Sequence, residues 1–201
     1  MKKEIKKEVM DMVFLLDKSG SMSGIEKDTI GGYNSYLKNN KDKNIKVTTI
    51  LFNNQYTIYN ERKDISKVKD LTEKEYQVGG TTALLDALGT SINYMEEQKA
   101  KKVMFIITTD GLENSSKEFT KEKIKEMIET HKDWEFVYIG ADIDSYKEGG
   151  NIGIKRTNIA NYTKDKKGIS NMFKSVNTIS NMYMCEEYID ENWKKDLEKH
   201  N

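Results

Sequence analysis

The chain has 201 residues, with 33 Lys or Arg balanced by 33 Asp or Glu, so its formal net charge is zero. This balance provides no global field that would attract nucleic acid or an anionic membrane, and we expect neither as a partner. A single cysteine, Cys185, excludes an internal disulfide framework and a cysteine-based zinc site.

The length and the pattern of the chain favour one domain over residues 1–201, because no repeat, low-complexity tract or linker divides it. The charged segment 1–12 lacks the apolar core of a signal peptide, and no apolar run reaches membrane-spanning length. We therefore expect a cytoplasmic protein.

A strand followed closely by a helix is predicted near the start of the chain. The unbroken apolar run 13–16 is typical of a strand that is buried on both faces. Ser23 and Glu26 have the spacing of a capping box, in which the two side chains bond the free N–H groups of a helix start. Apolar residues at helical spacing then carry the predicted helix from about 24 to 39.

The tight loop between this strand and this helix carries three side chains with oxygen atoms, Asp17, Ser19 and Ser21. A carboxylate and two hydroxyls on alternate residues form a ligand set for a hard cation such as Mg²⁺. The loop therefore indicates a metal site, for which other loops must supply the remaining ligands.

The next part of the chain predicts a hairpin and a long connection. Residues 45–52 are apolar and β-branched and predict a strand, and after a turn at Asn53 and Asn54 residues 56–59 form its short partner at a sheet edge. Residues 60–78 are charged and mixed, which predicts a surface connection with at most one weak helical turn.

A second loop with hydroxyl groups precedes the next predicted helix. The stretch Gly79–Thr82 breaks the chain before a helix with a clear apolar face over about 84–95. A second strongly apolar run, 103–109, predicts another buried strand, and this strand ends at Asp110.

The rest of the chain continues to alternate helices and strands. A second capping box at Ser115 and Glu118 predicts the start of a helix. Further elements are expected as a strand over 136–139, a short helix over 143–147, a strand over 157–162, an amphipathic helix over 169–183 and a terminal helix over 189–197. This alternation predicts an α/β fold with a doubly wound, mostly parallel sheet, helices on both faces and one antiparallel edge strand.

In a doubly wound sheet, ligands bind beyond the carboxyl ends of the central strands. The two most apolar strands are the candidates for the centre, and they end in Asp17 and Asp110. If these strands are neighbours, ~4.8 Å apart, the two carboxylates flank one crevice.

The D-x-S-x-S run at Asp17, Ser19 and Ser21 resembles the metal-ion-dependent adhesion site of von Willebrand factor type A domains. The resemblance covers about residues 10–184 and leaves 185–201 as a helical extension. It implies a Rossmann-like fold in which the two central strands are neighbours. It also implies two further ligands, a threonine from a second loop and an aspartate, here Asp110, from a third.

The resemblance favours Thr82 as that threonine. In the family the second loop often has a Gly-Gly-Thr sequence before an Asp-Ala-Leu pattern, and counting back four residues from Asp86 selects Thr82. Counting forward from the two glycines would select Thr81 instead, so both threonines remain candidates.

By resemblance, Ser19, Ser21 and Thr82 coordinate the ion directly, while Asp17 and Asp110 act largely through water and hydrogen bonds. The implied ion is Mg²⁺, or alternatively Mn²⁺ or Ca²⁺. One coordination position then stays open to the Asp or Glu carboxylate of a protein partner. This arrangement implies a docking module rather than an enzyme.

An enzymatic alternative also uses strand-end aspartates with Mg²⁺, namely phosphoryl transfer or a phospho-acceptor role. Dehalogenase-type phosphatases, however, need a second Asp at the position that Ser19 occupies here. Serine hydrolysis is disfavoured, because there is no G-x-S-x-G elbow and only His131 and His200 could act as a base. Asp142 and Asp144 are expected to face water.

Overall fold

The computed structural model describes residues 8–198, and its centre is a six-stranded sheet in the order β3-β2-β1-β4-β5-β6. Every neighbouring pair is parallel except β2 and β3, which are antiparallel. This arrangement confirms the predicted α/β fold and its antiparallel edge strand. The strands are β1 (Met10–Asp17), β2 (Ile45–Phe52), β3 (Tyr56–Asp64), β4 (Lys102–Thr109), β5 (Glu135–Gly140) and β6 (Ile159–Asn161).

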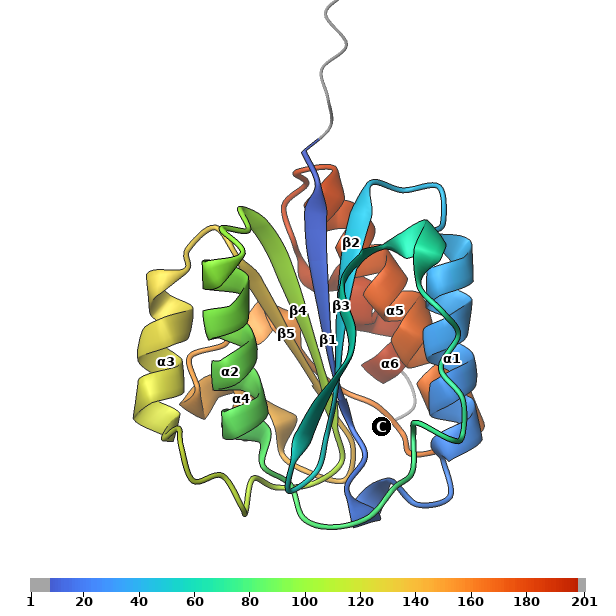
Figure 1. The fold of residues 1–201 in the computed structure, drawn as a ribbon, viewed down its shortest axis with the longest axis vertical. Coiled ribbons are helices and arrows are strands. Elements are labelled where there is room, and N and C mark those ends of the chain that lie inside the picture. Colours follow the sequence, from blue (N-terminus) through green and yellow to red (C-terminus); the bar gives the residue numbers. More distant parts are fainter. Residues whose placement is uncertain (1–7, 199–201) are drawn as a thin grey trace, which may run out of the picture.

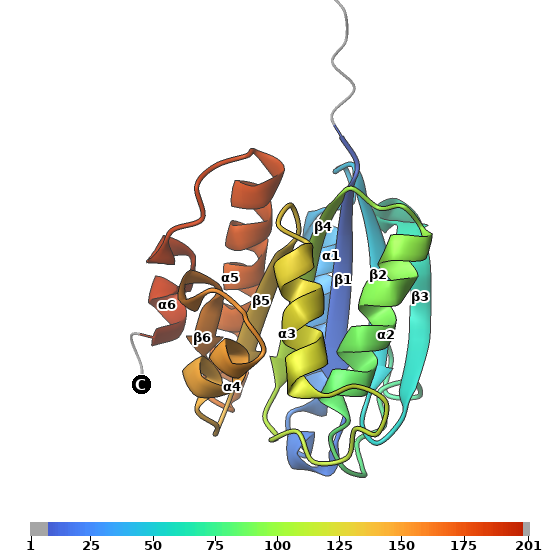
Figure 2. The same ribbon diagram turned by 90° about the vertical axis from the view of Figure 1, so that its left-hand side faces the viewer.

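Helices cover both faces of the sheet (Figures 1 and 2). One face carries α1 (Glu26–Asn39), α5 (Lys166–Met184) and α6 (Lys195–Glu198), and the other carries α2 (Leu84–Glu97), α3 (Lys121–Thr130) and α4 (Ser145–Asn151). Short 3-10 helices are η1 (Gly20–Met22), η2 (Ile65–Lys67), η3 (Arg156–Asn158) and η4 (Glu191–Lys194). Within the described residues, no helix combines the length and apolar character needed to cross a membrane.

Strand β1 is buried along its whole length, as its unbroken apolar run predicts. Successive side chains point to opposite faces, so Phe14 packs with the α1 and α5 side while Val13 and Leu15 pack with the α2 and α3 side. The ring of Phe14 meets Tyr33 and Tyr36 of α1 edge-on, with centroids 5.3 and 5.1 Å apart. The strand that leads into the candidate site is therefore held firmly from both sides.

The predicted capping box at the first helix is wrong. Helix α1 begins at Glu26, and Ser23 instead ends η1 by donating its backbone N–H to the carbonyl of Gly20. The Glu26 carboxylate accepts a hydrogen bond from the Gly24 N–H at 2.8 Å. The 3-10 turn Gly20–Met22 therefore takes Ser23 as its C-terminal cap, so this residue does not cap the helix.

The second predicted capping box is also wrong, because α3 begins at Lys121 with Thr120 as its cap. The segment before it is held as a loop by a residue of α2. The carboxylate of Asp86 accepts the backbone N–H groups of Lys117, Glu118 and Phe119 at 2.8, 2.9 and 3.0 Å. These hydrogen bonds hold the segment as a loop against α2, and the helix begins only at Lys121, where the Thr120 hydroxyl accepts the Lys123 N–H.

Two other segments differ from expectation. Strand β3 continues to Asp64, and the connection after it is partly internal, because Ile65, Leu71 and Tyr76 are buried against the α1 side of the sheet. The terminal helix is shorter than predicted and begins with η4, so Ile189 lies outside it.

Candidate metal centre

The candidate site lies at the carboxyl ends of β1 and β4, which are parallel neighbours at the centre of the sheet. The chain adds β2 and β3 on one side of β1, and β4, β5 and β6 on the other, so the connections diverge at this point. Such a switch point leaves a crevice between the diverging loops. The loops after β1 and β4 and the segment before α2 gather there, at the lower end of the sheet in Figure 1.

Asp17 is the last residue of β1 and is completely buried. Its Oδ1 accepts the Ser19 N–H at 2.7 Å, and its Oδ2 accepts the Thr109 hydroxyl at 2.6 Å. The Tyr76 hydroxyl donates to the Asp17 carbonyl. Burial raises the pKa of Asp17 above its usual range, although the hydrogen bonds from Thr109 and Ser19 oppose that effect. The carboxylate is thus fixed in place as an internal acceptor.

The next layer consists of hydroxyl groups and the second aspartate. The Oγ atoms of Ser19 and Ser21 are 3.0 Å apart, and Ser21 donates its hydroxyl to Oδ1 of Asp110 at 2.5 Å. The Asp110 side chain is 1% exposed, and its Oδ2 faces Lys164 Nζ at 2.7 Å. Both predicted aspartates therefore bond to the same loop, Asp17 at Ser19 and Asp110 at Ser21.

Thr82 completes the set, and Gly111 shows where the groups converge. A Cβ atom on Gly111 would lie 2.8 Å from Thr82 Oγ1, 3.3 Å from Ser21 Oγ and 3.7 Å from Ser19 Oγ. Three hydroxyls from two loops thus surround one small volume, which any side chain at position 111 would fill. The structure brings together all five residues selected from the sequence, Asp17, Ser19, Ser21, Thr82 and Asp110.

The choice between the two threonines follows from their positions. Thr82 is buried at 2% exposure and faces this volume, whereas Thr81 is exposed. The backbone of Thr82 is held by Asn114, whose Oδ1 accepts the Thr82 N–H at 2.9 Å and whose N–H donates to the Thr82 carbonyl at 3.0 Å.

Backbone hydrogen bonds tie the second loop to the first. The Gly79 N–H donates to the Lys18 carbonyl at 2.8 Å, and the Gly20 N–H donates to the Gly80 carbonyl at 3.0 Å. Gly80 has φ +78°, and a Cβ there would lie 2.2 Å from Asn54 Oδ1. Only glycine fits this close approach without strain.

The five candidate ligands suit a hard divalent cation, because each offers a hydroxyl or carboxylate oxygen. Across residues 8–198, the His, Cys, Asp and Glu side chains form no cluster of three or more that could hold a metal. The hydroxyl-rich set is therefore the candidate metal centre of the described chain.

The weaker candidates have structural explanations. Asp142 is exposed, and Asp144 caps α4 by accepting the Lys147 N–H at 3.1 Å. His131 stacks on Trp134, with its Nδ1 2.7 Å from the Met127 carbonyl and its Nε2 2.9 Å from Glu96. The second histidine, His200, lies outside the described residues.

Sequence reasoning missed several residues that shape the site. Thr109 and Asn114 hold Asp17 and Thr82, and Lys164 pairs with Asp110 from a segment 54 positions further along the chain. A threonine at a strand end carries a weak signal of such a role. No local pattern links Lys164 to the site, because the contact depends on where β6 ends.

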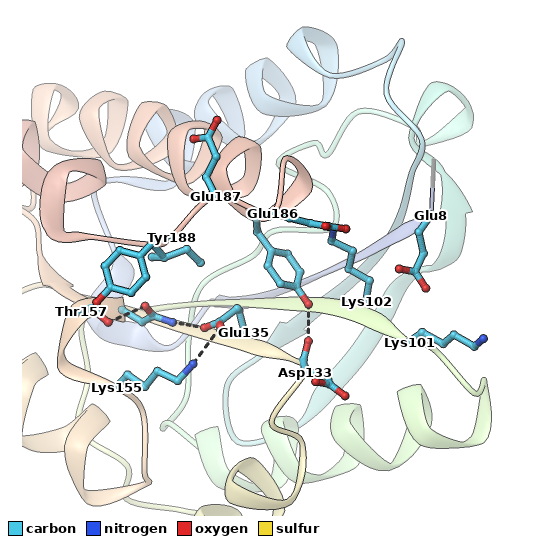
Figure 3. Close-up of a pocket in the computed structure, with 13 residues that line it drawn as sticks. Glu8, Lys101, Lys102, Asp133, Glu135, Lys155, Thr157, Glu186, Glu187 and Tyr188 are labelled. Atoms are coloured by element: carbon cyan, nitrogen blue, oxygen red, sulfur yellow. Dashed lines mark hydrogen bonds and ion pairs between the residues drawn. The ribbon is translucent and has the colours of Figure 1, made fainter. Parts of the chain in front are cut away.

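A hollow of about 660 Å³ lies at the opposite end of the sheet, where β4 and β5 begin (Figure 3). Its lining mixes five acidic residues with three lysines, and some of these groups form ion pairs. The Glu135 carboxylate is 3.0 Å from Lys155 Nζ and accepts from Asn158 at 2.6 Å, while Lys102 lies 3.5 Å from Glu186. The hollow therefore has no concentrated charge of one sign to attract an ionic ligand.

Solved structures with the same fold include domains from an animal matrix protein and from bacterial pili. Proximal thread matrix protein 1 from the mussel byssus, in a form with a zinc-occupied MIDAS motif, is 18% identical with a TM-score of 0.62, covering 87% of this chain and 46% of that one. The vWF domain of the type V pili tip protein Mfa5 from Porphyromonas gingivalis is 10% identical with a TM-score of 0.68, covering 89% and 97%. The pilus adhesin SpaC from Lactobacillus rhamnosus GG is 13% identical with a TM-score of 0.68, covering 89% and 30%.

The chain spans about half the length of the mussel protein. No curated protein matches it. The family model described as the von Willebrand factor type A domain matches residues 11–184, which is most of the chain. This match and the observed fold agree with the resemblance carried by Asp17, Ser19 and Ser21, and the chain belongs to the von Willebrand factor type A domain family.

Proposed function

We propose that this chain is a divalent-metal-dependent protein-binding module. In this proposal Ser19, Ser21 and Thr82 hold Mg²⁺ directly, and Asp17 and Asp110 support it through water and hydrogen bonds. The supporting observation is the convergence of three hydroxyls on the volume beside Gly111, next to the buried carboxylate of Asp110. Mn²⁺ or Ca²⁺ could take the same oxygen ligands.

The chemistry favours docking of an acid. The three side chains proposed as direct ligands are neutral hydroxyls, so a bound cation would have no anionic oxygen of this chain in direct contact. A bound divalent ion supplies a positive centre with an open coordination position, which suits an Asp or Glu carboxylate of a partner. Asp17 keeps the first loop in shape by accepting the Ser19 N–H, and Thr109 holds Asp17 in turn.

The named relatives are consistent with this proposal. One form of the mussel matrix protein has a zinc-occupied MIDAS motif. Other structural relatives are a pilus tip protein and a pilus adhesin. Their names refer to the mussel byssus and to pili, whereas we expect this chain in the cytoplasm. The proposal therefore concerns the binding chemistry of the domain and leaves the partner unnamed.

The phosphoryl-transfer alternative has less support from the geometry. A phospho-accepting aspartate must be reachable by its donor, but Asp17 is completely buried and both of its carboxylate oxygens accept hydrogen bonds. We expect no labelled aspartate after incubation with acetyl phosphate and Mg²⁺. Stoichiometric labelling of Asp17 or Asp110, located by mass spectrometry, would favour the enzyme.

Metal binding is tested first. Mg²⁺ or Mn²⁺ should raise the melting temperature of the wild type, because a ligand that binds only the native state stabilises it. Asp17→Ala should lose most of this increase while retaining its circular dichroism spectrum. An Asp17→Ala variant that responds to metal like the wild type would contradict the site.

The partner chemistry is tested with a displayed peptide library in which each peptide carries one Asp or Glu. Binders selected in Mg²⁺ should be released by EDTA and should lose binding when the acid is replaced by its amide. The same peptides should not bind Asp17→Ala. Selected binders that tolerate both EDTA and the amide would show that the surface recognises partners without the metal.

A further inference from the structure

A lysine from a distant segment reaches into the candidate metal centre. Lys164 lies between β6 and α5, and its Nζ is 2.7 Å from Oδ2 of Asp110 and donates to the carbonyl of Ser21. The lysine side chain is 24% exposed, while the aspartate side chain is 1% exposed. An ammonium group thus contacts one of the carboxylates assigned to the metal site.

The position of this ammonium has an electrostatic reason. Asp17 and Asp110 are both buried near each other, and a buried carboxylate without a compensating charge is costly. Oδ1 of Asp110 accepts the Ser21 hydroxyl, and Oδ2 faces Lys164. Without a metal ion, the lysine supplies positive charge at the same carboxylate that a metal ion would use.

The backbone around Lys164 is held independently of its side chain. The Tyr162 N–H donates to the Gly140 carbonyl at 2.9 Å, and Asp165 Oδ1 accepts the Gly168 N–H at 2.7 Å as the cap of α5. A Cβ on Gly168 would lie 2.0 Å from the Thr163 carbonyl oxygen, so the turn is tightly packed. The flexible four-carbon stem of Lys164 can therefore move its charge while the loop stays in place.

We propose that Lys164 is a built-in competitor of the divalent metal. Without metal, its ammonium compensates Asp110 and closes the site from the β6 side. When a divalent ion enters, the two positive charges repel and the ammonium moves from Asp110 to the exposed rim. Lys164 thereby lowers the metal affinity and raises the metal concentration at which the site fills. This inference rests on the proposed metal site.

The first test measures the affinity for Mn²⁺, from the free-ion signal in electron paramagnetic resonance. Lys164→Met, which keeps the stem and removes the charge, should bind Mn²⁺ on the order of tenfold more tightly, a change equivalent to about 1.4 kcal/mol. Lys164→Arg keeps the charge, and Lys167→Met removes a charge from an exposed position on α5. Lys164→Arg should remain within about twofold of the wild type because it keeps the positive charge, and Lys167→Met should do so because solvent and salt screen an exposed charge.

The second test uses only the wild type and does not depend on the folding of a variant. Lysines are acetylated briefly with an N-hydroxysuccinimide ester, and each site is quantified by mass spectrometry. Labelling of Lys164 should increase several-fold when Mg²⁺ is added, whereas labelling of Lys167 should not change. Asp17→Ala should lose the Mg²⁺ effect at Lys164. Labelling of Lys164 that is unchanged or reduced by Mg²⁺ in a metal-bound wild type would overturn the inference.

The outcomes separate this inference from the proposed function. If the wild type binds Mn²⁺ and Lys164→Met binds it equally or more weakly, Lys164 is not a competitor and the metal site stands. If only Lys164→Met binds Mn²⁺, both are supported, since the charge alone kept the ion out. If neither binds, both fall, because removing the ammonium should have opened the site.

Discussion

At the candidate metal centre, the position of single atoms decides which residues can act as ligands. Thr81 and Thr82 are adjacent and identical in chemistry, yet only Thr82 directs its hydroxyl at the volume shared with Ser19 and Ser21. Asn114 holds the Thr82 backbone by hydrogen bonds. Backbone hydrogen bonds of Gly79 with Lys18 and of Gly80 with Gly20 hold the rest of that loop. Whether a residue can act as a ligand here depends on the direction of its side chain as much as on its residue type.

Replacing each threonine separately tests this distinction. Thr82→Ala should weaken Mg²⁺ binding by at least about tenfold, because it removes one of three hydroxyls around the ion. Thr81→Ala is the matched control and should stay within about twofold, since its side chain faces solvent. Isothermal titration calorimetry measures both. Equal losses in the two variants would contradict the assignment of Thr82.

Gly111 offers a second test at the residue scale. Gly111→Ala should abolish most of the Mg²⁺-dependent rise in melting temperature, because its Cβ would lie 2.8 Å from Thr82 Oγ1 and fill the volume between the hydroxyls. The control is Gly150→Ala, whose Cβ meets nothing within 4 Å. Differential scanning fluorimetry with and without Mg²⁺ measures the effect. A Gly111→Ala variant with the full wild-type response would show that the ion binds elsewhere.

Among the elements, contacts between helices and loops overrode the local signals of the chain. The Asp86 carboxylate of α2 accepts three backbone N–H groups of the loop before α3, and that helix begins at Lys121 instead of near Ser115. Helices α1 and α5 approach closely where Gly32 faces the ring of Phe173. This contact joins α1, which follows the loop of Ser19 and Ser21, to α5, which follows Lys164.

Adjacent glycines on α1 test the close approach. Gly31→Ala should raise the free energy of unfolding by about 0.5–1 kcal/mol, because alanine favours a helix and its Cβ meets nothing within 4 Å. Gly32→Ala should lower it by about 1–3 kcal/mol, because its Cβ would lie 2.1 Å from Phe173 Cδ2. Urea denaturation measures both variants. A higher free energy of unfolding in Gly32→Ala would mean that α1 and α5 can move apart at little cost in stability.

Across the whole molecule, the sheet order brings together groups that are far apart along the chain. The site takes residues from the loops after β1 and β4, from the segment before α2 and, at Lys164, from the loop after β6. The described residues beyond the family match, 185–198, pack on the α5 side of the sheet (Figure 2). There Trp193 is buried and donates its Nε1–H to the Thr157 carbonyl at 2.8 Å.

The terminal segment should therefore contribute to stability and not to metal binding. Trp193→Ala should lower the free energy of unfolding by about 3–5 kcal/mol, the usual cost of removing a buried aromatic side chain. Tyr188→Ala is the control, because that ring is 84% exposed and its loss should cost less than about 0.5 kcal/mol. Urea denaturation measures stability, and calorimetry should show unchanged Mg²⁺ affinity in both. A similar small effect in the two variants would show that the segment is only loosely attached.

The sequence by itself determined the fold class and indicated four of the candidate ligands, while it left Thr81 and Thr82 as alternatives for the fifth. Buried strands have an unbroken apolar run, and the polar residues that end them, Asp17 and Asp110, contrast sharply with it. The D-x-S-x-S spacing then added the family resemblance. These signals are local, so they are visible without knowledge of the fold.

The tertiary structure decided what depends on contacts between distant segments. It placed the hydroxyl of Thr82 at the shared volume, moved the starts of two helices, buried Ile65 and Leu71 in an apparent surface connection and brought Lys164 to Asp110. Each of these outcomes is a competition between a local preference and a long-range hydrogen bond, ion pair or apolar contact. A local sequence pattern contains only the local preference. The long-range contacts that oppose it form when the sheet and its helices assemble.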